Sequence, residues 1–354
     1  MWYAKIPERD AEKARRLLSA LCVFDRSRET VHSRSYVYFP VIDTDAKAKK
    51  LISKSGIEMV ERRSAKRSVR IDYREALERI LGKREREQLA RGYELLGNIA
   101  IIELSDELKK KEKRIAQALM IANPRVKTVL AKAGGVYGMY RKRKLRYIAG
   151  ARSYLADYRE NNCTFRFDVR QVFFSSKLSF ERSRVASLVD GKERVMVVGA
   201  GVGPFVVEIA KGHPKASVVG IEPNRHAYDA MKYNIKANKT QNAKAELGDV
   251  RKAYKKYAGY ADRIIVPMPT VSLEFLDQII SIAKKKSIIH LYVFGSAESV
   301  LADSWKRVKA HAKANGYRTK MLGHRIVRPY SAKEVELVID FLVDKIRRGQ
   351  KRQI

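Results

Sequence analysis

Cysteine and tryptophan are scarce in this 354-residue chain, with two residues of each, and there are only nine prolines. Cys22 and Cys163 stand far apart, and neither belongs to a Cys-x-x-Cys pair or to a cluster with histidines. This spacing argues against a disulfide-stapled fold and against a structural zinc site, so we expect no bound metal. Reduced thiols are typical of the cytoplasm, which is the localisation that we expect.

The chain also lacks a long uninterrupted apolar segment. Its longest apolar run, Val195 to Val207, is broken by three glycines and a proline, whereas a membrane-spanning helix needs about 20 consecutive apolar residues. The first ten residues are rich in charge and contain no apolar core of the kind found in signal peptides. We therefore expect a soluble protein that is neither secreted nor bound to a membrane.

Acidic residues are few relative to basic ones, because 39 Asp and Glu stand against 74 Lys and Arg and the formal net charge is +35. This excess is far beyond what solubility requires, and it implies a polyanionic partner. Charged residues still make up 32% of the chain and hydrophobic residues 45%. That balance is typical of a folded protein with basic faces, and the length allows two or three domains of about 100 to 200 residues each.

The hydrophobic pattern divides the chain into three parts. Residues 1–62 combine two apolar strand patterns with an amphipathic helix pattern, which indicates a small α/β module. Residues 63–180 show helix patterns followed by several short strand patterns, and they predict an α+β middle domain. A basic segment, Glu61–Ser68, separates the two and is interpreted as a linker or as a solvated helix face.

In the third part, residues 181–354, strand and helix patterns alternate in regular steps. The strands of this alternation are expected at Arg194–Val198, Ser217–Ile221, Ala243–Leu247, Arg263–Val266 and Ile288–Phe294. Such alternation builds a mostly parallel sheet with helices on both faces. The last two strand patterns, Tyr317–Val327 and Val335–Val343, have no helix between them and predict an antiparallel hairpin that closes the sheet. The expected fold class is therefore α/β with a mixed, mostly parallel sheet.

A glycine-rich segment follows directly after the first of these strands. Gly199 to Gly203 stands where a nucleotide-binding fold turns from its first strand into its first helix, and glycines there let the backbone approach a ligand. Glu222 lies about 20 residues further on, at the end of the second strand, where a carboxylate can accept hydrogen bonds from both ribose hydroxyls. Strand, glycines and acid together predict a nucleotide cofactor site.

NAD and S-adenosylmethionine both fit these features. The Gly-x-Gly-x-Gly spacing and Asp249, in a turn expected to contact adenine at the end of the third strand, favour the methyl donor. Pro267-Met268-Pro269 at the end of the fourth strand points the same way. Methyltransferases that act on planar nitrogens often carry an Asn/Asp-Pro-Pro/Leu-Pro turn at that place, facing the base. An ordinary rigid loop is the alternative interpretation of this turn.

Taken in order, these segments resemble the archaeal and eukaryotic family of tRNA (guanine-37 N1)-methyltransferases over essentially the whole chain. The segments that carry the resemblance are Ala4–Pro7, Tyr36–Pro40, Leu96–Ile102, Asn123–Val129, Tyr140–Leu145, Glu160–Cys163, Phe173–Ser175, Glu181–Arg182 and Ala200–Phe205. The resemblance implies a Rossmann-like class I methyltransferase domain at the C-terminus and S-adenosylmethionine as the cofactor. It implies tRNA as the partner, with the first domain gripping the tRNA corner.

Two departures from the family pattern concern the cofactor and base sites. Family members often have Asp-Met-Phe before the Ala-Gly-Val-Gly-Pro motif, where this chain has Val197, Val198 and Gly199. Many members have Asn at the position of Pro267, and a subset of archaeal relatives has Met-Pro-Leu-Pro in that turn. We interpret the second departure as a subgroup marker, with guanine recognition shifted to backbone carbonyls or other residues.

The resemblance also implies roles in the reaction. Neutral guanine carries a proton on N1, so a base must remove it, and Glu181 is the candidate base. Arg141 is the candidate that stabilises the charge pushed onto O6, and Arg182 is expected to position phosphate or cofactor. A solvated helix start is the alternative for Glu181 and Arg182, and a simple phosphate contact is the alternative for Arg141.

Two sets of residues are predicted to bind the cofactor and the substrate. Those predicted to bind the cofactor are Arg182, Gly199, Ala200, Gly201, Gly203, Glu222, Pro223, Asp249 and Val250. Those predicted to bind the substrate are Arg141, Arg143, Lys144, Arg182, Pro267 and Pro269.

The predicted function is methyl transfer from S-adenosylmethionine to N1 of the guanosine 3′ to the tRNA anticodon. Two alternatives lie within the family: an enzyme that also methylates the wyosine precursor 4-demethylwyosine, and an enzyme that transfers an aminocarboxypropyl group. A tRNA-binding protein without turnover is an alternative of a different class. We expect a monomer, with no protein partner.

Overall fold

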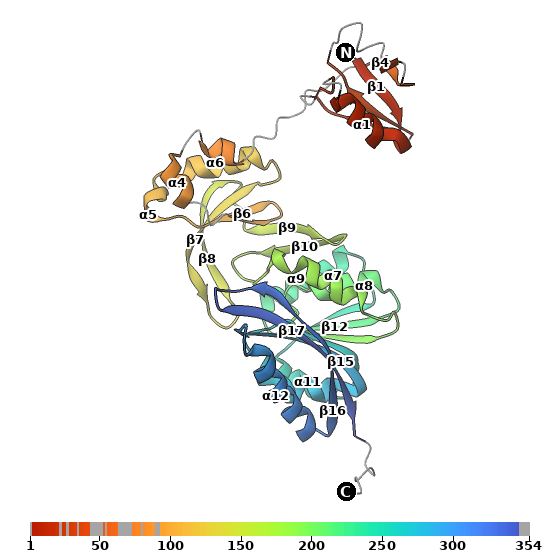
Figure 1. Cartoon of the computed structure of the whole chain (residues 1–354). Helices are drawn as coiled ribbons and strands as arrows, with labels where there is room; N and C mark the ends of the chain where they lie inside the picture. The colour runs from red at the N-terminus through yellow and green to blue at the C-terminus, as the bar shows by residue number, and fades with distance from the viewer. Residues whose placement is uncertain are drawn as a thin grey trace. The chain divides into compact units, whose positions relative to one another are not determined.

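The computed structural model describes residues 2–20, 23–25, 28–33, 35–42, 52–53, 55–62, 73–78, 81–88 and 93–346. Its contacts divide the chain into two compact units, Met1–Glu75 and Ala76–Ile354. The units are described separately below (Figure 1). Most of the predicted basic linker at Glu61–Ser68 lies outside the described residues.

The first unit is a small antiparallel sheet with helix α1 against it. Its strands, in the order β2-β3-β1-β4, are Val31–His32, Tyr36–Pro40, Trp2–Pro7 and Glu58–Glu61. Helix α1 (Ala11–Ala20) follows a short 3₁₀ turn and contributes Ala14 and Leu18 to the core. Ala4 and Ile6 of β1 point into the same core, because alternate residues of a strand face opposite sides of the sheet. This arrangement is the α/β module that the sequence predicts.

The second unit opens with a mixed four-stranded sheet. Its strands, in the order β5-β6-β7-β8, are Tyr93–Leu96, Ile99–Ile102, Thr128–Tyr137 and Lys142–Gly150. The helices that precede or interrupt these strands are α3 (Tyr73–Glu78), α4 (Lys83–Gln88), α5 (Asp106–Lys109) and α6 (Glu112–Ala122). The sequence predicts one helix over 106–122, but the structure has two, α5 and α6. Between them the hydrogen bonds join residues three positions apart, as in Lys111 N–H to Leu108 O, so the regular α-helical pattern is interrupted.

Strand β7 also differs from the sequence-based expectation, which has two strands on either side of Gly134 and Gly135. The structure runs one strand through both glycines, with a register shift against β8 between Lys132 and Val136. Glycine pairs inside a strand pattern mark either a turn or a bulge, and here the chain bulges. The β7–β8 turn that follows the bulge lines a cavity.

A two-stranded hairpin, β9 (Leu155–Glu160) and β10 (Cys163–Asp168), follows the mixed sheet. Its turn residues Asn161 and Asn162 have φ of 45° and 61°, as the tightest hairpin turns require. The outer edge of β10 is bonded by side chains instead of a third strand. Asn234 accepts from Arg166 N–H at 2.8 Å, and Asn238 accepts from Thr164 N–H at 2.9 Å. These two amides fasten the hairpin to the last part of the chain.

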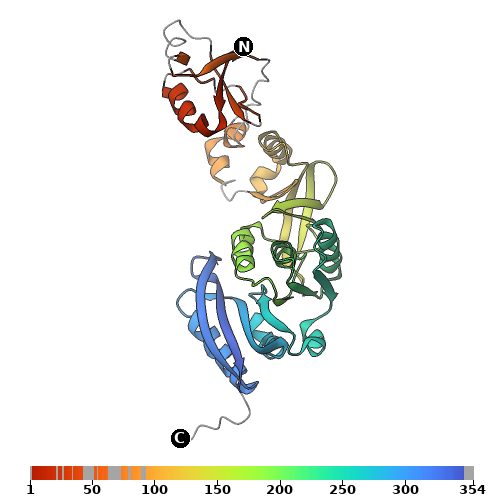
Figure 2. The ribbon, with the colours of Figure 1, turned by 90° about the vertical axis from the view of Figure 1, so that its right-hand side faces the viewer.

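The last part is a seven-stranded sheet in the order β13-β12-β11-β14-β15-β17-β16. Its strands are β11 (Arg194–Val198), β12 (Ser217–Glu222), β13 (Ala243–Leu247), β14 (Ala261–Val266), β15 (Ala283–Ser296), β16 (Tyr317–Pro329) and β17 (Glu334–Lys345). The first five run parallel, and β17 runs antiparallel between β15 and β16. Figures 1 and 2 show the long β16–β17 hairpin in blue at this end of the sheet. The predicted fold class and closing hairpin are confirmed.

Helices cover both faces of this sheet. They are α7 (Ser179–Ser187), α8 (Pro204–Gly212), α9 (Arg225–Ala237), α10 (Val250–Ala253), α11 (Leu276–Ile282) and α12 (Val300–Ala314). Val195 and Val197 of β11 pack with α7, α8 and α9, whereas Met196 and Val198 pack with α11 and α12. A strand buried on both faces reads as a continuous apolar run, which explains the unbroken sequence of β11.

The predicted boundary between a middle domain and the methyltransferase domain, at residues 180 and 181, stays a prediction. One apolar core joins β6, the β9–β10 hairpin and Phe174 to Val202 and Val207 at the start of α8. The two predicted domains are therefore packed around a shared core within the second unit.

Candidate active site

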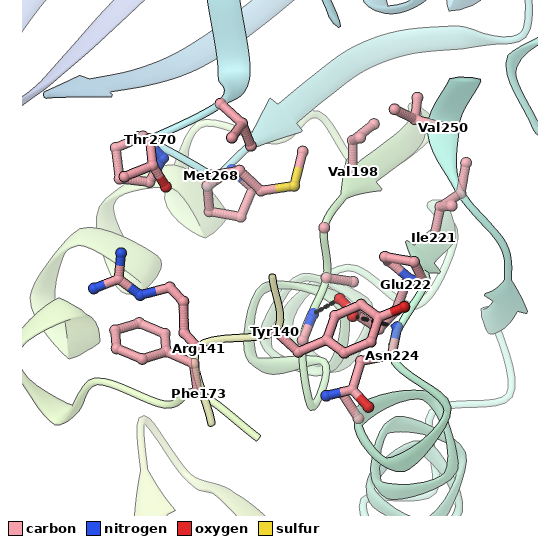
Figure 3. Close-up of a pocket in the computed structure, with 18 of the residues that line it drawn as sticks. Tyr140, Arg141, Phe173, Val198, Ile221, Glu222, Asn224, Val250, Met268 and Thr270 are labelled. Atoms are coloured by element: carbon pink, nitrogen blue, oxygen red, sulfur yellow. Dashed lines mark hydrogen bonds between the residues drawn. The ribbon is translucent and has the colours of Figure 1, made fainter. Parts of the chain in front are cut away.

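A cavity of about 540 Å³ opens where the parallel strands of the large sheet end. One wall comes from the turn after β11, the end of β12, the start of α10 and the loop after β14. The other wall comes from the β7–β8 turn, from Phe173–Ser175 and from the β16–β17 hairpin. Ligands of open α/β sheets bind at this edge, so the cavity lies where the topology places a cofactor (Figure 3).

Three left-handed glycines shape the turn between β11 and α8. Gly199, Gly201 and Gly203 have φ of 73°, 58° and 85°, conformations that other residues rarely adopt. A Cβ at Gly203 would stand 2.7 Å from Met231, so close packing also requires glycine there. A Cβ at Gly201 would meet no atom within 4 Å and would project into open space beside the cavity. That space is available to a ligand.

The two departures from the family pattern, Gly199 before the glycine motif and the altered Pro267–Pro269 turn, are in close contact in the structure. A Cβ on Gly199 would stand 2.2 Å from the sulfur of Met268, which lies in the turn between Pro267 and Pro269. A phenylalanine at position 199 is therefore incompatible with this position of Met268. Figure 3 shows the Met268 side chain lying toward the end of β11 beside Val198. The glycine before the motif and the altered turn are one structural feature.

Glu222 is held rigidly at the end of β12. Its two carboxylate oxygens accept from Gly201 N–H at 2.8 Å and from Asn224 N–H at 2.9 Å, and only 7% of the residue is exposed. Burial raises the pKa of this carboxyl, against the opposing effect of the two backbone donors. Pro223 follows it in the cavity wall. A fixed carboxylate with further lone pairs facing a cavity fits the predicted role of binding ribose hydroxyls.

Asp249 and Val250 form the next part of the same wall. Asp249 accepts from Arg251 N–H at 2.8 Å at the start of α10, and the Arg251 guanidinium pairs with it and holds its pKa below the usual value. Val250 is buried and presents an apolar surface. Open glycine backbone, a fixed carboxylate and an apolar surface are the features that the predicted S-adenosylmethionine site requires.

Arg141 stands on the opposite wall in a strained conformation. Its φ of 52° is unusual for a residue with a side chain, and its guanidinium lies 4.8 Å from the centre of the Phe173 ring. The Nε atom of Arg141 is buried without a hydrogen-bond partner. Figure 3 shows Arg141 and Phe173 together, across from Met268 and Thr270. Strain and an unpaired buried donor concentrate at functional positions, so both features mark Arg141 as a candidate functional residue.

Of the other residues predicted to contact the substrate, two line the cavity and two do not. Pro267 and Pro269 line the cavity. Arg143 lies outside the lining, pairs with Glu94 at 2.6 Å and donates to the carbonyl of Phe174 at 3.1 Å. Lys144 is exposed on β8 and also stands apart from the lining. The structure thus gives Arg143 a structural ion pair and leaves Lys144 at the surface.

Glu181 lies outside the cavity lining, which differs from the position expected of a base. Its side chain is 3% exposed, accepts from Tyr292 Oη at 2.7 Å and forms two hydrogen bonds with Arg184, at 2.7 and 3.0 Å. Arg325 approaches the same carboxylate at 3.5 Å. The alternative interpretation as a solvated helix start is wrong, because the group is buried in a network.

Arg182 does line the cavity, but it is 2% exposed and already paired. Glu160 binds its guanidinium through two hydrogen bonds of 2.6 Å each, and the carbonyl of Ser175 accepts at 3.1 Å. The solvated interpretation is wrong for this residue too. A bidentate pair of this kind fixes the plane of the guanidinium.

A second carboxylate, Glu208 of α8, approaches Arg182 at 3.6 Å. Asn161 donates to one Glu208 oxygen at 2.9 Å, and the other oxygen is buried without a partner. Burial, followed by the neighbouring Glu160 carboxyl, raises the pKa of Glu208 to about 8. Two buried carboxylates share one guanidinium, so a proton on Glu208 balances the charge.

Sequence reasoning missed this cluster and also missed Arg328 and Glu336, which line the cavity and pair at 2.5 Å. No motif marks the second pair, because only the antiparallel register of β16 with β17 sets Arg328 opposite Glu336. Glu160 and Arg182 stood in segments that resemble the family, but nothing in their spacing indicates an ion pair. Across the described ranges, no group of three His, Cys, Asp or Glu side chains could hold a metal ion, and no helix is long and apolar enough to span a membrane.

The Glu208 carboxyl predicts a pH-dependent stability. A carboxyl whose pKa rises on folding stabilises the fold fully below its unfolded pKa, and this contribution is lost as the pH rises through the folded pKa. The window therefore runs from about 4.5 to about 8. Glu208→Gln should match the wild type near pH 5 and be more stable by about 2 to 4 kcal/mol at pH 8.5. Denaturant unfolding at both pH values measures this difference.

The matched control is Glu298→Gln, because Glu298 is an exposed glutamate. This change should leave the pH dependence as it is in the wild type. Parallel stability curves for the wild type and Glu208→Gln would contradict the protonated state of Glu208.

Comparison with known proteins places these features in a family. A TRM5/TYW2 methyltransferase domain matches residues 156–320, a TYW2 N-terminal domain matches 73–153, and a tRNA methyltransferase 5 N-terminal domain matches 5–49. The sequence is 33% identical over 341 residues to the tRNA (guanine(37)-N(1))-methyltransferase Trm5b of Pyrococcus abyssi. The match covers 96% of this chain and 98% of that relative.

Solved structures show the same relationship. The crystal structure of Pyrococcus abyssi Trm5b superposes with a TM-score of 0.71 at 32% identity, over 97% of this chain and 99% of that one. A complex of aTrm5 with tRNALeu gives 0.68 at 26% identity, over 98% and 100%. Pyrococcus horikoshii TYW2 in complex with MeSAdo gives 0.67 at 26% identity, over 77% and 98%. The chain belongs to the TRM5/TYW2 methyltransferase family.

Proposed function

We propose that this chain transfers a methyl group from S-adenosylmethionine to N1 of guanosine 37 in tRNA. The observation that carries the proposal is one cavity with two unlike walls: the glycine turn, Glu222 and the Pro267–Pro269 turn on one side, and Arg141 with Phe173 on the other. The Pyrococcus abyssi relative that matches nearly the whole chain is named for this reaction. The proposed partner is therefore tRNA, which fits the net charge of +35.

The cofactor wall binds and orients the methyl donor. S-adenosylmethionine, when bound, supplies an electrophilic methyl group on a sulfonium. Glu222 would hold the ribose hydroxyls, the backbone at Gly201 would lie against the ligand, and Val250 would contact the adenine. The apolar cavity surface excludes water from the reacting atoms, which strengthens the electrostatic interactions there.

The opposite wall handles the charge and the proton of guanine. Loss of the N1 proton moves negative charge to O6, and the Arg141 guanidinium, whose residue lines the cavity, is the proposed donor for it. Glu181 is still the predicted base, but its carboxylate must leave Tyr292 and Arg184 to reach the cavity. Glu336 is the rival, because its carboxylate already lines the cavity beside Arg328. A base must come within about 3 Å of the proton or act through one water.

The product identifies the reaction. Purified protein, S-adenosylmethionine and unmodified tRNA transcripts with guanosine or adenosine at position 37 should give 1-methylguanosine only with the guanosine transcript. Nucleoside mass analysis separates a methyl from an aminocarboxypropyl group, which is one of the alternatives within the family. Tight tRNA binding with no modified nucleoside would instead support a binding protein without turnover.

A transcript that carries 4-demethylwyosine at the same position tests whether the wyosine precursor is a second substrate. Methylation of both nucleosides would mean a bifunctional enzyme. The cytoplasm is the proposed compartment because the substrate is tRNA, and a monomer remains the expected oligomeric state.

The open space at Gly201 generates a prediction about the cofactor. Gly201→Trp should weaken S-adenosylmethionine binding by about 100-fold or more, because the indole occupies the space that backbone and ligand share. Gly316→Trp is the control, since Gly316 is also left-handed, with φ of 77°, and also has no atom within 4 Å of a built Cβ. Calorimetric titration should show normal affinity in the control. Equal S-adenosylmethionine affinities in the two variants would show that the cofactor does not bind at this turn.

Substitutions of Glu181 and of Glu336 show which of the two carboxylates is the base. Glu181→Gln should slow single-turnover methyl transfer by about 10²- to 10⁴-fold at neutral pH, with tRNA and cofactor affinities near those of the wild type. The loss should shrink at high pH, because guanine N1 then ionises without help. Glu336→Gln should lack this pH-dependent rescue. If instead Glu336→Gln shows the rescuable loss and Glu181→Gln does not, Glu336 is the base and Glu181 has a structural role.

A further inference from the structure

Two large apolar side chains beside the cavity are unusually exposed. Among the large hydrophobic residues that the structure describes, Met139 and Phe180 have the highest exposed fractions, 72% and 71%. Met139 lines the cavity itself, and Phe180 lies between Leu178 and Arg182, which both line it. Large apolar side chains exposed on elements that also line a site mark a surface that a partner covers.

The Phe180 ring is paired with a cation. The Arg325 guanidinium lies 5.3 Å from the ring centre, and its strand, β16, contributes Arg328 to the cavity lining. Arg325 and Arg328 are three positions apart on this strand, a span of about 10 Å. Both partners therefore lie close to the cavity, on two different elements.

Glu181 steadies this pair. Arg325 Nη1 stands 3.5 Å from the Glu181 carboxylate, which Tyr292 of the sheet and Arg184 of the same helix hold in place. A guanidinium tethered in this way loses less conformational entropy when a ligand arrives. The ring and the cation form a preorganised surface.

Aromatic rings and guanidinium planes are the groups on which unpaired RNA bases stack. We infer that Phe180 and Arg325 form a stacking platform for the unpaired nucleotide next to the one that enters the cavity. The inference rests on the proposed function, because it requires RNA to deliver its base to this cavity. It adds a flanking-base contact to that function.

Charge on the same strand favours RNA over an apolar partner. Beyond the platform, β16 exposes Arg318 and Lys320. Cations along one strand attract a phosphate backbone that continues past the stacked base. A purely apolar partner would gain nothing from these groups and would have to desolvate them.

A fluorescent base tests the platform. Transcripts carrying 2-aminopurine at the nucleotide before or after guanosine 37 are titrated with the full-length protein. Binding of the wild type should quench one of the two probes, and Phe180→Ala should abolish most of that quenching and weaken tRNA binding about tenfold or more. Phe180→Trp should restore both. S-adenosylmethionine affinity should be unchanged in both variants.

Tyr233 offers a matched control. It is also an exposed aromatic residue, 47% exposed, with Arg166 at 5.5 Å from its ring, but neither residue lines the cavity. Tyr233→Ala should leave quenching and affinity at wild-type values. Unchanged quenching in Phe180→Ala, or an equal loss in Tyr233→Ala, would overturn the platform.

The same experiment keeps the two proposals apart. A wild-type protein that methylates guanosine 37 while Phe180→Ala behaves identically overturns the platform alone. A wild-type protein that neither binds nor methylates the transcript overturns the proposed function, and the platform with it.

Discussion

Two consecutive buried charges at the start of α7 hold the second unit together. Arg182 binds Glu160 of the β9–β10 hairpin, and Glu181 binds Tyr292 of the large sheet. Arg184, one turn later, links Glu181 to Asp340 of β17 at 2.7 Å. Removing one partner of a buried ion pair leaves an uncompensated charge and costs about 3 to 5 kcal/mol. The short helix therefore fixes the hairpin and the closing strands at one place.

The network continues across the strands of the sheet. Asp340 accepts from the His290 ring at 2.6 Å, and Arg263 donates to the other nitrogen of that ring at 2.8 Å. Burial lowers the pKa of His290, so the neutral ring joins the two charged groups without adding a charge. Arg263 ends the chain of contacts in a pair with Glu193 at 2.6 Å. Alternating charges of this kind satisfy each other inside an otherwise apolar sheet.

The cavity inherits its geometry from this arrangement. Its cofactor wall depends on local structure, since a strand end, a glycine turn and the start of a helix follow one another in the chain. Its opposite wall depends on the position of the middle strands and of the β16–β17 hairpin, which α7 connects. This arrangement costs conformational free energy at Arg141, because its strained backbone and unpaired Nε persist only where the surrounding structure holds them.

The sequence alone determined the α/β fold class, the closing hairpin, the glycine turn and Glu222, because each depends on short-range patterns of apolarity, chain direction and turn chemistry. The bounds of β11, α9 and β13 follow from the same patterns. Tertiary structure alone decided which charged side chains meet. Arg328 faces Glu336 through strand register, and Glu181 is buried while Phe180 beside it is exposed. The free energy of a charge depends on its burial and its partners, and residues distant in the chain supply both.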